Sequence, residues 1–233
     1  MMQSEKGRWH LAGATPSEVL LMLPDMGKIM VIFRENGVTH ERIGVVETAT
    51  AHDCCVDLKG GAHDARVDAS VLSGMVLDTS SEMQGRTYPR LEFIGAGGET
   101  VFAVVGMEGA APFITALSNV GRSDAEARSS VGSSRDPEQP GLETDRGHAF
   151  LKQLIGSAVE IVARRPGFRQ AWQGRIDGVK PAMGFSNVMT GDFHLHLKGG
   201  TVADWQADGD TSFALDDTGA RTGLEIRRVG AHP

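Results

Sequence analysis

Two histidines at alternating positions are the residues whose types and spacing most readily suggest metal chemistry. His194 and His196 lie in the run Phe193–Lys198, which alternates apolar and polar side chains as a half-buried strand does. Alternate side chains of a strand point to one face, and imidazole nitrogens suit zinc, copper, iron and nickel. No nearby carboxylate or third histidine completes such a site, so we interpret the pair as structural.

Other candidate motifs have a spacing that does not suit chemistry. His40-Glu41 and His52-Asp53 are adjacent pairs, and adjacent side chains of an extended chain point to opposite faces, which makes them poor acid–base couples. The glycine-rich run Gly95–Gly98 joins two predicted strands, and no helix start follows it to supply the dipole of a phosphate-binding loop. We interpret this run as a turn.

The two cysteines of the chain are neighbours, Cys54 and Cys55. A disulfide between neighbours forms only with strain, and structural zinc sites usually take spaced ligands that converge from two segments. We interpret the pair as small, partly buried residues on a strand, with the reduced thiols that are typical of the cytoplasm.

Charge and hydropathy narrow the class of protein. The 233-residue chain has a formal net charge of −7, which argues against a nucleic-acid partner because such proteins usually carry a basic excess or stripe. No stretch approaches the roughly 20 apolar residues of a membrane span, and the first 13 residues lack the apolar run of a signal peptide. We expect a soluble cytoplasmic protein without membrane insertion. Its main basic cluster suits one anionic small molecule and consists of Arg164, Arg165, Arg169 and Arg175.

The elements that must position these residues are mostly strands. Thr15–Glu18, which includes Pro16, matches the capping-box start of a short helix, and Pro24 ends that helix. Lys28–Arg34 is typical of a buried strand, and Asn36-Gly37 predicts a hairpin turn. Further strands are expected at residues 38–43, 65–71, 74–78, 90–94, 100–105, 159–163, 168–173, 193–198, 201–206, 212–215 and 224–228, and helices at residues 112–120 and 148–155.

A polar segment divides the chain into halves that share a pattern. Residues 121–147 are rich in helix and strand breakers and predict a flexible linker between a unit at residues 15–120 and a unit at residues 148–230. Three anchors occur in the same order in both halves, which favours duplication. The first anchor matches residues 28–37 with 158–167, and in both halves a second glycine follows the turn glycine by seven positions, Gly44 after Gly37 and Gly174 after Gly167. The second matches Asp64–Val67 with Asp192–Leu195. The third matches Leu91–Ile94 followed by Gly98 with Ser212–Leu215 followed by Gly219.

The repeat predicts the fold class. Each half is expected to be an antiparallel β-meander flanked by short helices, which makes the protein α+β. Two such units in tandem would form a pseudo-dimer, and the cleft at an interface of this kind is a common ligand site.

The second half also carries the most specific strings, Met183-Gly184, Asn187-Val188-Met189 and Asp192–Leu197, followed by Trp205. In this order they resemble the C-terminal repeat of the haemin-degrading factor family (HemS/ChuS/ChuX-like). The first half resembles the N-terminal repeat of that family at Val38–Gly44 and Leu91–Glu99. The resemblance covers most of residues 17–119 and 148–226, and the chain is identified as a shortened two-repeat member.

The resemblance implies a haem site. Members of the family are cytoplasmic proteins that bind one haem between their repeats; some pass it to a haem oxygenase, and some are reported to degrade it with an electron donor. The axial histidine of the family lies in an Asp-x-His-x-Phe-Phe string, which corresponds here to Asp145–Leu151 with one extra residue. His148 is therefore the candidate iron ligand, since a neutral imidazole binds haem iron through one ring nitrogen; the alternative is an ordinary surface histidine near a helix start.

Basic residues are the remaining candidates for haem contacts. The family places an arginine of the first repeat on the opposite haem face, and Arg90 falls within one position of it, although a one-residue shift on a strand turns a side chain to the other face. Propionates require Arg or Lys, and the basic and tyrosine-bearing strings of the family are not evident. Acidic Asp208-Gly209-Asp210 occupies part of that region, so Lys152 and Arg175 are the possible substitutes, together with Arg164 and Arg165.

Three functions follow from these expectations. The first is a cytoplasmic haem carrier or storage protein that binds no metal other than haem iron. The second is a haem-degrading enzyme that uses the same pocket, and the third is a degenerate member that no longer binds haem and serves as an interaction protein. As two fused units, the protein is expected to be a monomer or a homodimer.

Overall fold

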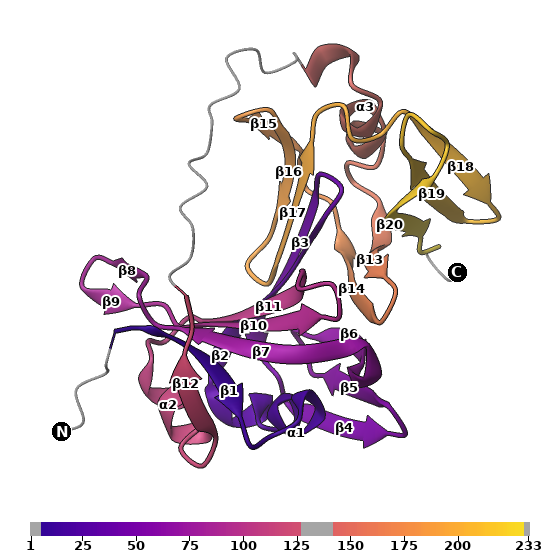
Figure 1. The fold of residues 1–233 in the computed structure, drawn as a ribbon. Helices are drawn as coiled ribbons and strands as arrows, with labels where there is room; N and C mark the ends of the chain where they lie inside the picture. The colour runs from indigo at the N-terminus through magenta and orange to yellow at the C-terminus, as the bar shows by residue number, and fades with distance from the viewer. Residues whose placement is uncertain (1–5, 127–141, 231–233) are drawn as a thin grey trace. The chain divides into compact units, whose positions relative to one another are not determined.

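The computed structural model describes residues 6–126 and 142–230, which form mainly antiparallel strands with a few short helices (Figure 1). This composition confirms the predicted α+β class. Among the described residues, no helix is long and apolar enough to cross a membrane. The described chain divides into unit 1, with residues 6–32, 42–126 and 166–168, and unit 2, with residues 33–41, 142–165 and 169–230.

Unit 1 contains a sheet in the order β12-β1-β7-β10-β11-β2 and a meander in the order β6-β5-β4. Helix α1 packs against β4, β5 and β7. Stacking of Phe93 on Phe102, with ring centroids 4.5 Å apart, marks the core of the unit. The elements of unit 1 are β1 (Arg8–Ala12), α1 (Pro16–Leu21), the 3-10 helix η1 (Leu23–Met26), the first part of β2 (Lys28–Glu35), the last part of β3 (Val38–Val45), β4 (Thr48–His52), β5 (Cys55–Lys59), β6 (Asp64–Asp68), the 3-10 helix η2 (Ala69–Val71), β7 (Leu72–Asp78), β8 (Glu82–Met83), β9 (Arg86–Thr87), β10 (Arg90–Gly95), β11 (Thr100–Gly106), α2 (Ala111–Ala116) and β12 (Gly121–Asp124).

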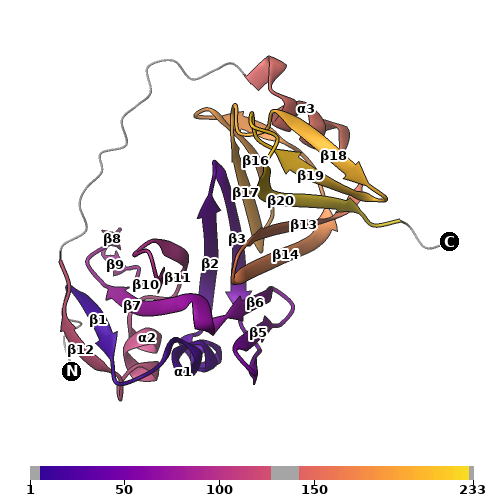
Figure 2. The ribbon, with the colours of Figure 1, turned by 45° about the vertical axis from the view of Figure 1, so that its right-hand side comes forward.

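Unit 2 contains a sheet in the order β18-β19-β20-β13-β14 and a second sheet in the order β3-β17-β16-β15, to which β3 contributes its first residues. Its core includes Phe193, which stacks on Trp172 with centroids 4.4 Å apart and meets His40 edge-on at 4.8 Å. The other elements of unit 2 are the 3-10 helix η3 (Leu142–Thr144), α3 (Arg146–Gln153), β13 (Ala158–Arg165), β14 (Phe168–Arg175), β15 (Lys180–Ala182), β16 (Phe185–Met189), β17 (Phe193–Lys198), β18 (Asp204–Asp208), β19 (Thr211–Leu215) and β20 (Arg221–Arg228) (Figure 2).

The two halves of the chain run through the same order of elements. Each has a helix, a hairpin, a three-stranded meander and then three further strands of a sheet, and in each the sheet lies next to the first strand of the hairpin. Strands β2 and β13, the first strands of the two hairpins, also share one order of exposed, half-buried and buried residues. This period-two pattern around an apolar centre is the reason that both segments form central strands.

The turns of the two hairpins require glycine. Gly37 and Gly167 have φ of 76° and 80°, a left-handed conformation that costs other residues about 1–2 kcal/mol. The Gly37 carbonyl accepts a hydrogen bond from the Lys198 amide, and the Gly167 carbonyl accepts one from the Asp68 amide, both at 2.9 Å. A Cβ at either glycine would overlap a neighbouring side chain, Thr201 in unit 2 and Val71 in unit 1.

Several local predictions are confirmed. Thr15 and Glu18 form the expected capping box of α1, Asn36-Gly37 forms the turn with positive φ at both residues, and Gly95–Gly98 is a turn between β10 and β11.

The strand predicted at residues 65–71 ends at Asp68, because the Asp68 carboxylate accepts the Ser70 amide and starts η2. The helix predicted at residues 112–120 is the shorter α2.

The structure differs from the prediction where strands are polar. Residues 121–124, predicted to be linker, form the edge strand β12, which pairs with β1 while all its side chains are exposed. Backbone pairing at an edge needs no apolar face, so β12 lacks the alternation of apolar and polar residues that predicts a strand. Residues 142–147, also predicted to be linker, belong to η3 and the start of α3, and the remaining part of that prediction, residues 127–141, lies outside the described residues.

Candidate functional site

Helix α3 fixes the position of His148. The Asp145 side chain caps the helix by accepting the His148 amide at 2.7 Å and the Gly200 amide at 2.8 Å. The extra residue of the Asp-x-His string therefore lies inside the helix, and His148 is its third residue. The residue is 8% exposed, and its ring makes a 2.8 Å hydrogen bond between Nδ1 and the Ser186 hydroxyl of β16. His148 is thus a buried, oriented imidazole rather than a free surface histidine.

Two of the predicted basic residues lie in the same unit as His148. Lys152 follows His148 by one helical turn and is exposed in the last turn of α3. Arg175 is exposed at the end of β14, and its guanidinium lies 3.6 Å from where a Cβ on Gly156, just after α3, would be. Unit 2 therefore offers two cations near the helix that carries His148.

The other predicted arginines form ion pairs with glutamates. Arg90 belongs to unit 1, where its Nε lies 2.9 Å from the buried Glu92. In unit 2, Arg164 pairs with Glu225 at 2.7 Å, Arg165 with Glu35 at 3.5 Å and Arg169 with Glu160 at 3.2 Å. These pairs compensate the positive charge that the sequence suggested for an anionic ligand.

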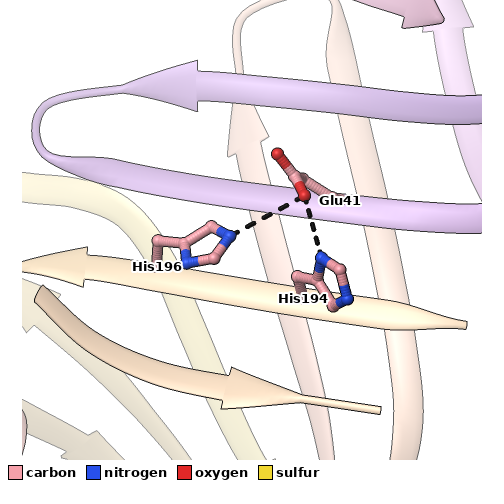
Figure 3. A group of neighbouring side chains, drawn as sticks. All are labelled: Glu41, His194 and His196. Carbon is pink, nitrogen blue, oxygen red and sulfur yellow. Dashed lines mark hydrogen bonds and ion pairs between the residues drawn. The ribbon is translucent and has the colours of Figure 1, made fainter. Parts of the chain in front are cut away.

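A second group of side chains, on the sheet face of β3 and β17, joins Glu41 to His194 and His196 (Figure 3). Oε2 of Glu41 lies 3.1 Å from His194 Nδ1 and 3.7 Å from His196 Nε2. All three side chains are partly accessible, with exposed fractions of 12% to 27%. The interpretation that no carboxylate accompanies these histidines is wrong, because pairing of β17 with β3 brings Glu41 to them, 153 positions before His194 in the chain.

The electrostatics of this cluster favour an ionised Glu41. Burial acts to raise the pKa of the Glu41 carboxyl, but hydrogen bonds and charge interactions with His196 and His194 outweigh it, so the pKa is lowered. The adjacent His40 points to the opposite face, where its ring bonds the Ile161 carbonyl oxygen at 3.2 Å and the Gln170 amide at 3.0 Å. The expectation of opposite faces for His40 and Glu41 is confirmed.

Asn187 completes the group and was not predicted as a site residue. It lies opposite His196 in the β16–β17 register, and its Oδ1 is 2.6 Å from His196 Nδ1. The available signal was the Asn187-Val188-Met189 string together with strand alternation, which puts Asn187 and Phe185 on one face and Ser186 on the other.

A cavity of about 860 Å³ opens on the same face as His196. By the register of β16, Ser186 faces α3 while Phe185 and Asn187 face the cavity, so the cavity and His148 lie on opposite faces of one sheet. The wall combines thioether, aromatic and cationic groups. It is lined by Arg34, Glu35, Asn36, Gly37, Thr39, Lys180, Ala182, Met183, Phe185, Asn187, Met189, His196 and Lys198.

Unit 1 has a thiol cluster of a different character. Cys54 Sγ lies 3.9 Å from Cys55 Sγ, and Asp68 is close to both. Cys54 is exposed in the turn before β5, so the expectation that both cysteines are partly buried strand residues holds only for Cys55. Hydrogen bonds to Asp68 and Cys55 raise the pKa of the Cys54 thiol, which disfavours the thiolate that metals bind.

Comparison with known proteins identifies the fold. No family model and no curated protein sequence matches the chain. Escherichia coli ChuS, a haem oxygenase, matches at 14% identity with a TM-score of 0.72 over 97% of this chain and 84% of that one. PhuS, a haem-binding protein of Pseudomonas aeruginosa, matches at 15% identity with a TM-score of 0.73 over 96% of this chain and 82% of that one. Over nearly its whole length, the chain therefore has the ChuS-like fold that its sequence motifs implied.

Proposed function

We propose that this protein binds haem and carries or stores it in the cytoplasm. The observation that carries the proposal is the likeness of nearly the whole chain to ChuS and PhuS, one described as a haem oxygenase and the other as a haem-binding protein. The motif resemblance points to the same ligand independently, because it rests on residue strings rather than on backbone geometry.

His148 is the proposed iron ligand. Its Nδ1 is engaged by the Ser186 hydroxyl, which leaves Nε2 as the nitrogen for iron. Histidines that bind metals usually have the other ring nitrogen held by such a partner, which fixes the ring orientation. When haem is bound, its iron supplies the oxygen chemistry, while the protein supplies the ligand, the orientation and the local charge.

Lys152 and Arg175 are the proposed partners of the propionates. Both are exposed cations in unit 2, one on α3 and one beside the end of that helix. Hydrogen bonds from Lys or Arg to a carboxylate are roughly twice as strong as neutral ones. Arg90 is a weaker candidate because Glu92 already binds it.

We also propose that the chain arose by duplication and forms a pseudo-dimer. The support is the repeated order of elements, the shared burial pattern of β2 and β13, and the matching glycine turns at Gly37 and Gly167. Two fused units of this kind suit a monomer that needs no second chain to complete its site.

Titration with haemin tests the proposal. The wild-type protein should give a shifted Soret band at one haemin per chain, and His148→Ala should change that band and weaken binding. His52→Ala, which alters an exposed histidine of β4 in unit 1, is the matched control. The absence of any haemin-dependent Soret shift in the wild type would refute haem binding and favour an interaction protein. If His196→Ala removes the band and His148→Ala does not, the cavity holds the haem and the ligand assignment is wrong.

A second function, haem degradation, is favoured by the likeness to a haem oxygenase. Ascorbate or a reductase added to the haem complex under oxygen distinguishes a haem-degrading enzyme from a haem carrier. Loss of the Soret band with release of a bile pigment in the presence of catalase identifies an enzyme, and a band that persists identifies a carrier.

A further inference from the structure

The cluster of Glu41, His194 and His196 has the donor set of a metal site that is separate from haem. Two imidazole nitrogens and one carboxylate oxygen converge from the adjacent strands β3 and β17, and the three atoms all lie within 4.8 Å of one another (Figure 3). Two donors bound to one tetrahedral zinc ion at the usual 2.0–2.1 Å are about 3.3 Å apart. The observed separations from Glu41 Oε2, 3.1 Å and 3.7 Å, lie on either side of that value.

Hydrogen bonds around Asn187 determine which nitrogen of His196 can bind a cation. The Asn187 amide group donates to the carbonyl oxygens of Lys180 at 2.9 Å and Phe185 at 3.1 Å. This fixes the amide so that Oδ1 faces His196 and accepts a hydrogen bond from Nδ1 at 2.6 Å. Asn187 therefore engages Nδ1, and Nε2 is the nitrogen of His196 that faces Glu41.

The nitrogen of His196 that faces Glu41 lies at a distance that suits a metal ion bound to both side chains. The Nε2 atom of His196 and Oε2 of Glu41 are 3.7 Å apart, a separation that two ligand atoms of one zinc ion can have. Asn187 acts on His196 as outer-shell partners act on metal-bound histidines, by fixing the tautomer and the ring orientation. The partial exposure of all three ligands leaves a path for an ion to enter.

We propose that Glu41, His194 and His196 bind a divalent transition metal, with Zn²⁺ as the best fit. Two histidines and one glutamate form a known ligand set of catalytic zinc, which keeps a fourth position for water or a ligand. His196 also lines the cavity, so the metal would lie beside a space of the size in which proteins bind small molecules. Lys180 and Lys198 in the cavity wall favour an anion there.

Zinc titration without haem tests this site, so its outcome is independent of the haem proposal. The chain is used untagged, treated with a chelator, and carries Cys54→Ser and Cys55→Ser to remove the thiol cluster of unit 1. Isothermal titration should show one Zn²⁺ per chain. Glu41→Gln, His194→Ala and His196→Ala should each weaken binding by more than the 10–100-fold that loss of an outer-shell partner costs, and His52→Ala should leave it unchanged.

Two results would overturn the proposal. One is the absence of zinc binding by the parent chain, and the other is binding that survives all three substitutions. Glu41→Gln keeps the shape of the side chain, and circular dichroism verifies that each variant is folded. Co²⁺ provides a second measurement on the parent alone, because a four- or five-coordinate cobalt site absorbs strongly in the visible range and the hydrated ion does not. A spectrum identical to that of hydrated Co²⁺ would contradict the site.

Discussion

Replacement of Ser186 by alanine tests whether this hydroxyl holds the His148 ring. Ser186 is fully buried, and its hydroxyl lies 2.8 Å from Nδ1 of His148, a residue that is itself only 8% exposed. A hydrogen bond of this kind contributes about 0.5–1.5 kcal/mol, and a buried polar group left without a partner costs about 1–3 kcal/mol. We expect Ser186→Ala to lower the free energy of unfolding by about 1–2 kcal/mol. Haem affinity should fall by about 10–100-fold, as for other outer-shell partners.

Tryptophan fluorescence in urea provides the assay. Trp205 stacks on Phe150 of α3 with centroids 4.1 Å apart, and Trp172 lies in the core of unit 2. Trp9→Phe removes the third tryptophan of the chain, so the signal then reports only unit 2. A double-mutant cycle with His148→Ala isolates the contribution of the pair.

The cycle also defines the result that would refute the reasoning. A coupling energy near 1 kcal/mol is expected, whereas a value within about 0.3 kcal/mol of zero is what independent sites show. Ser73→Ala, which removes a 2.7 Å bond to the Gly95 carbonyl in unit 1, is the control and should not couple to His148. If Ser186→Ala leaves haem affinity unchanged while His148→Ala abolishes binding, Ser186 does not orient the ligand.

Three further predictions concern the scaffold. Gly37→Ala should destabilise the protein by more than the roughly 1–2 kcal/mol cost of a left-handed residue, because a Cβ there also meets Thr201. Gly98 has φ of 83° and open space around it, so Gly98→Ala should cost only the left-handed backbone conformation. Urea unfolding midpoints measure both effects. Phe193→Ala should cost about 3–5 kcal/mol, because it empties a fully buried site against Trp172; a loss below 1 kcal/mol would contradict this packing. Hydrogen bonds from Thr15 lower the pKa of Glu18 in the folded protein from its ordinary 4.5. The contribution of the Glu18 carboxylate to the stability of the fold is therefore complete above pH 4.5 and is lost as the pH falls through the lowered pKa of the folded protein. Thermal melts between about pH 5 and 3 should therefore fall less steeply for Glu18→Gln than for wild type.

Local sequence rules account for much of the fold. The Thr15–Glu18 capping box and the Asn36-Gly37 turn depend only on neighbouring residues and are found as predicted. Strand alternation likewise places His194 and His196 on one face. Polar edge strands such as β12 escaped prediction because their stability comes from backbone pairing with β1, a partner more than 100 residues away.

Site chemistry depends on pairings that no local rule contains. The sequence by itself determined that His194 and His196 share a face and that Glu41 points away from His40, because alternation is a property of a single strand. Only the tertiary structure decided that these faces meet, since the order β3-β17-β16 sets which side chains become neighbours. The same holds for His148: its place on a helix follows from the motif, but its bond to Ser186, and its separation from the cavity by the thickness of a sheet, follow from the packing of α3 on β16.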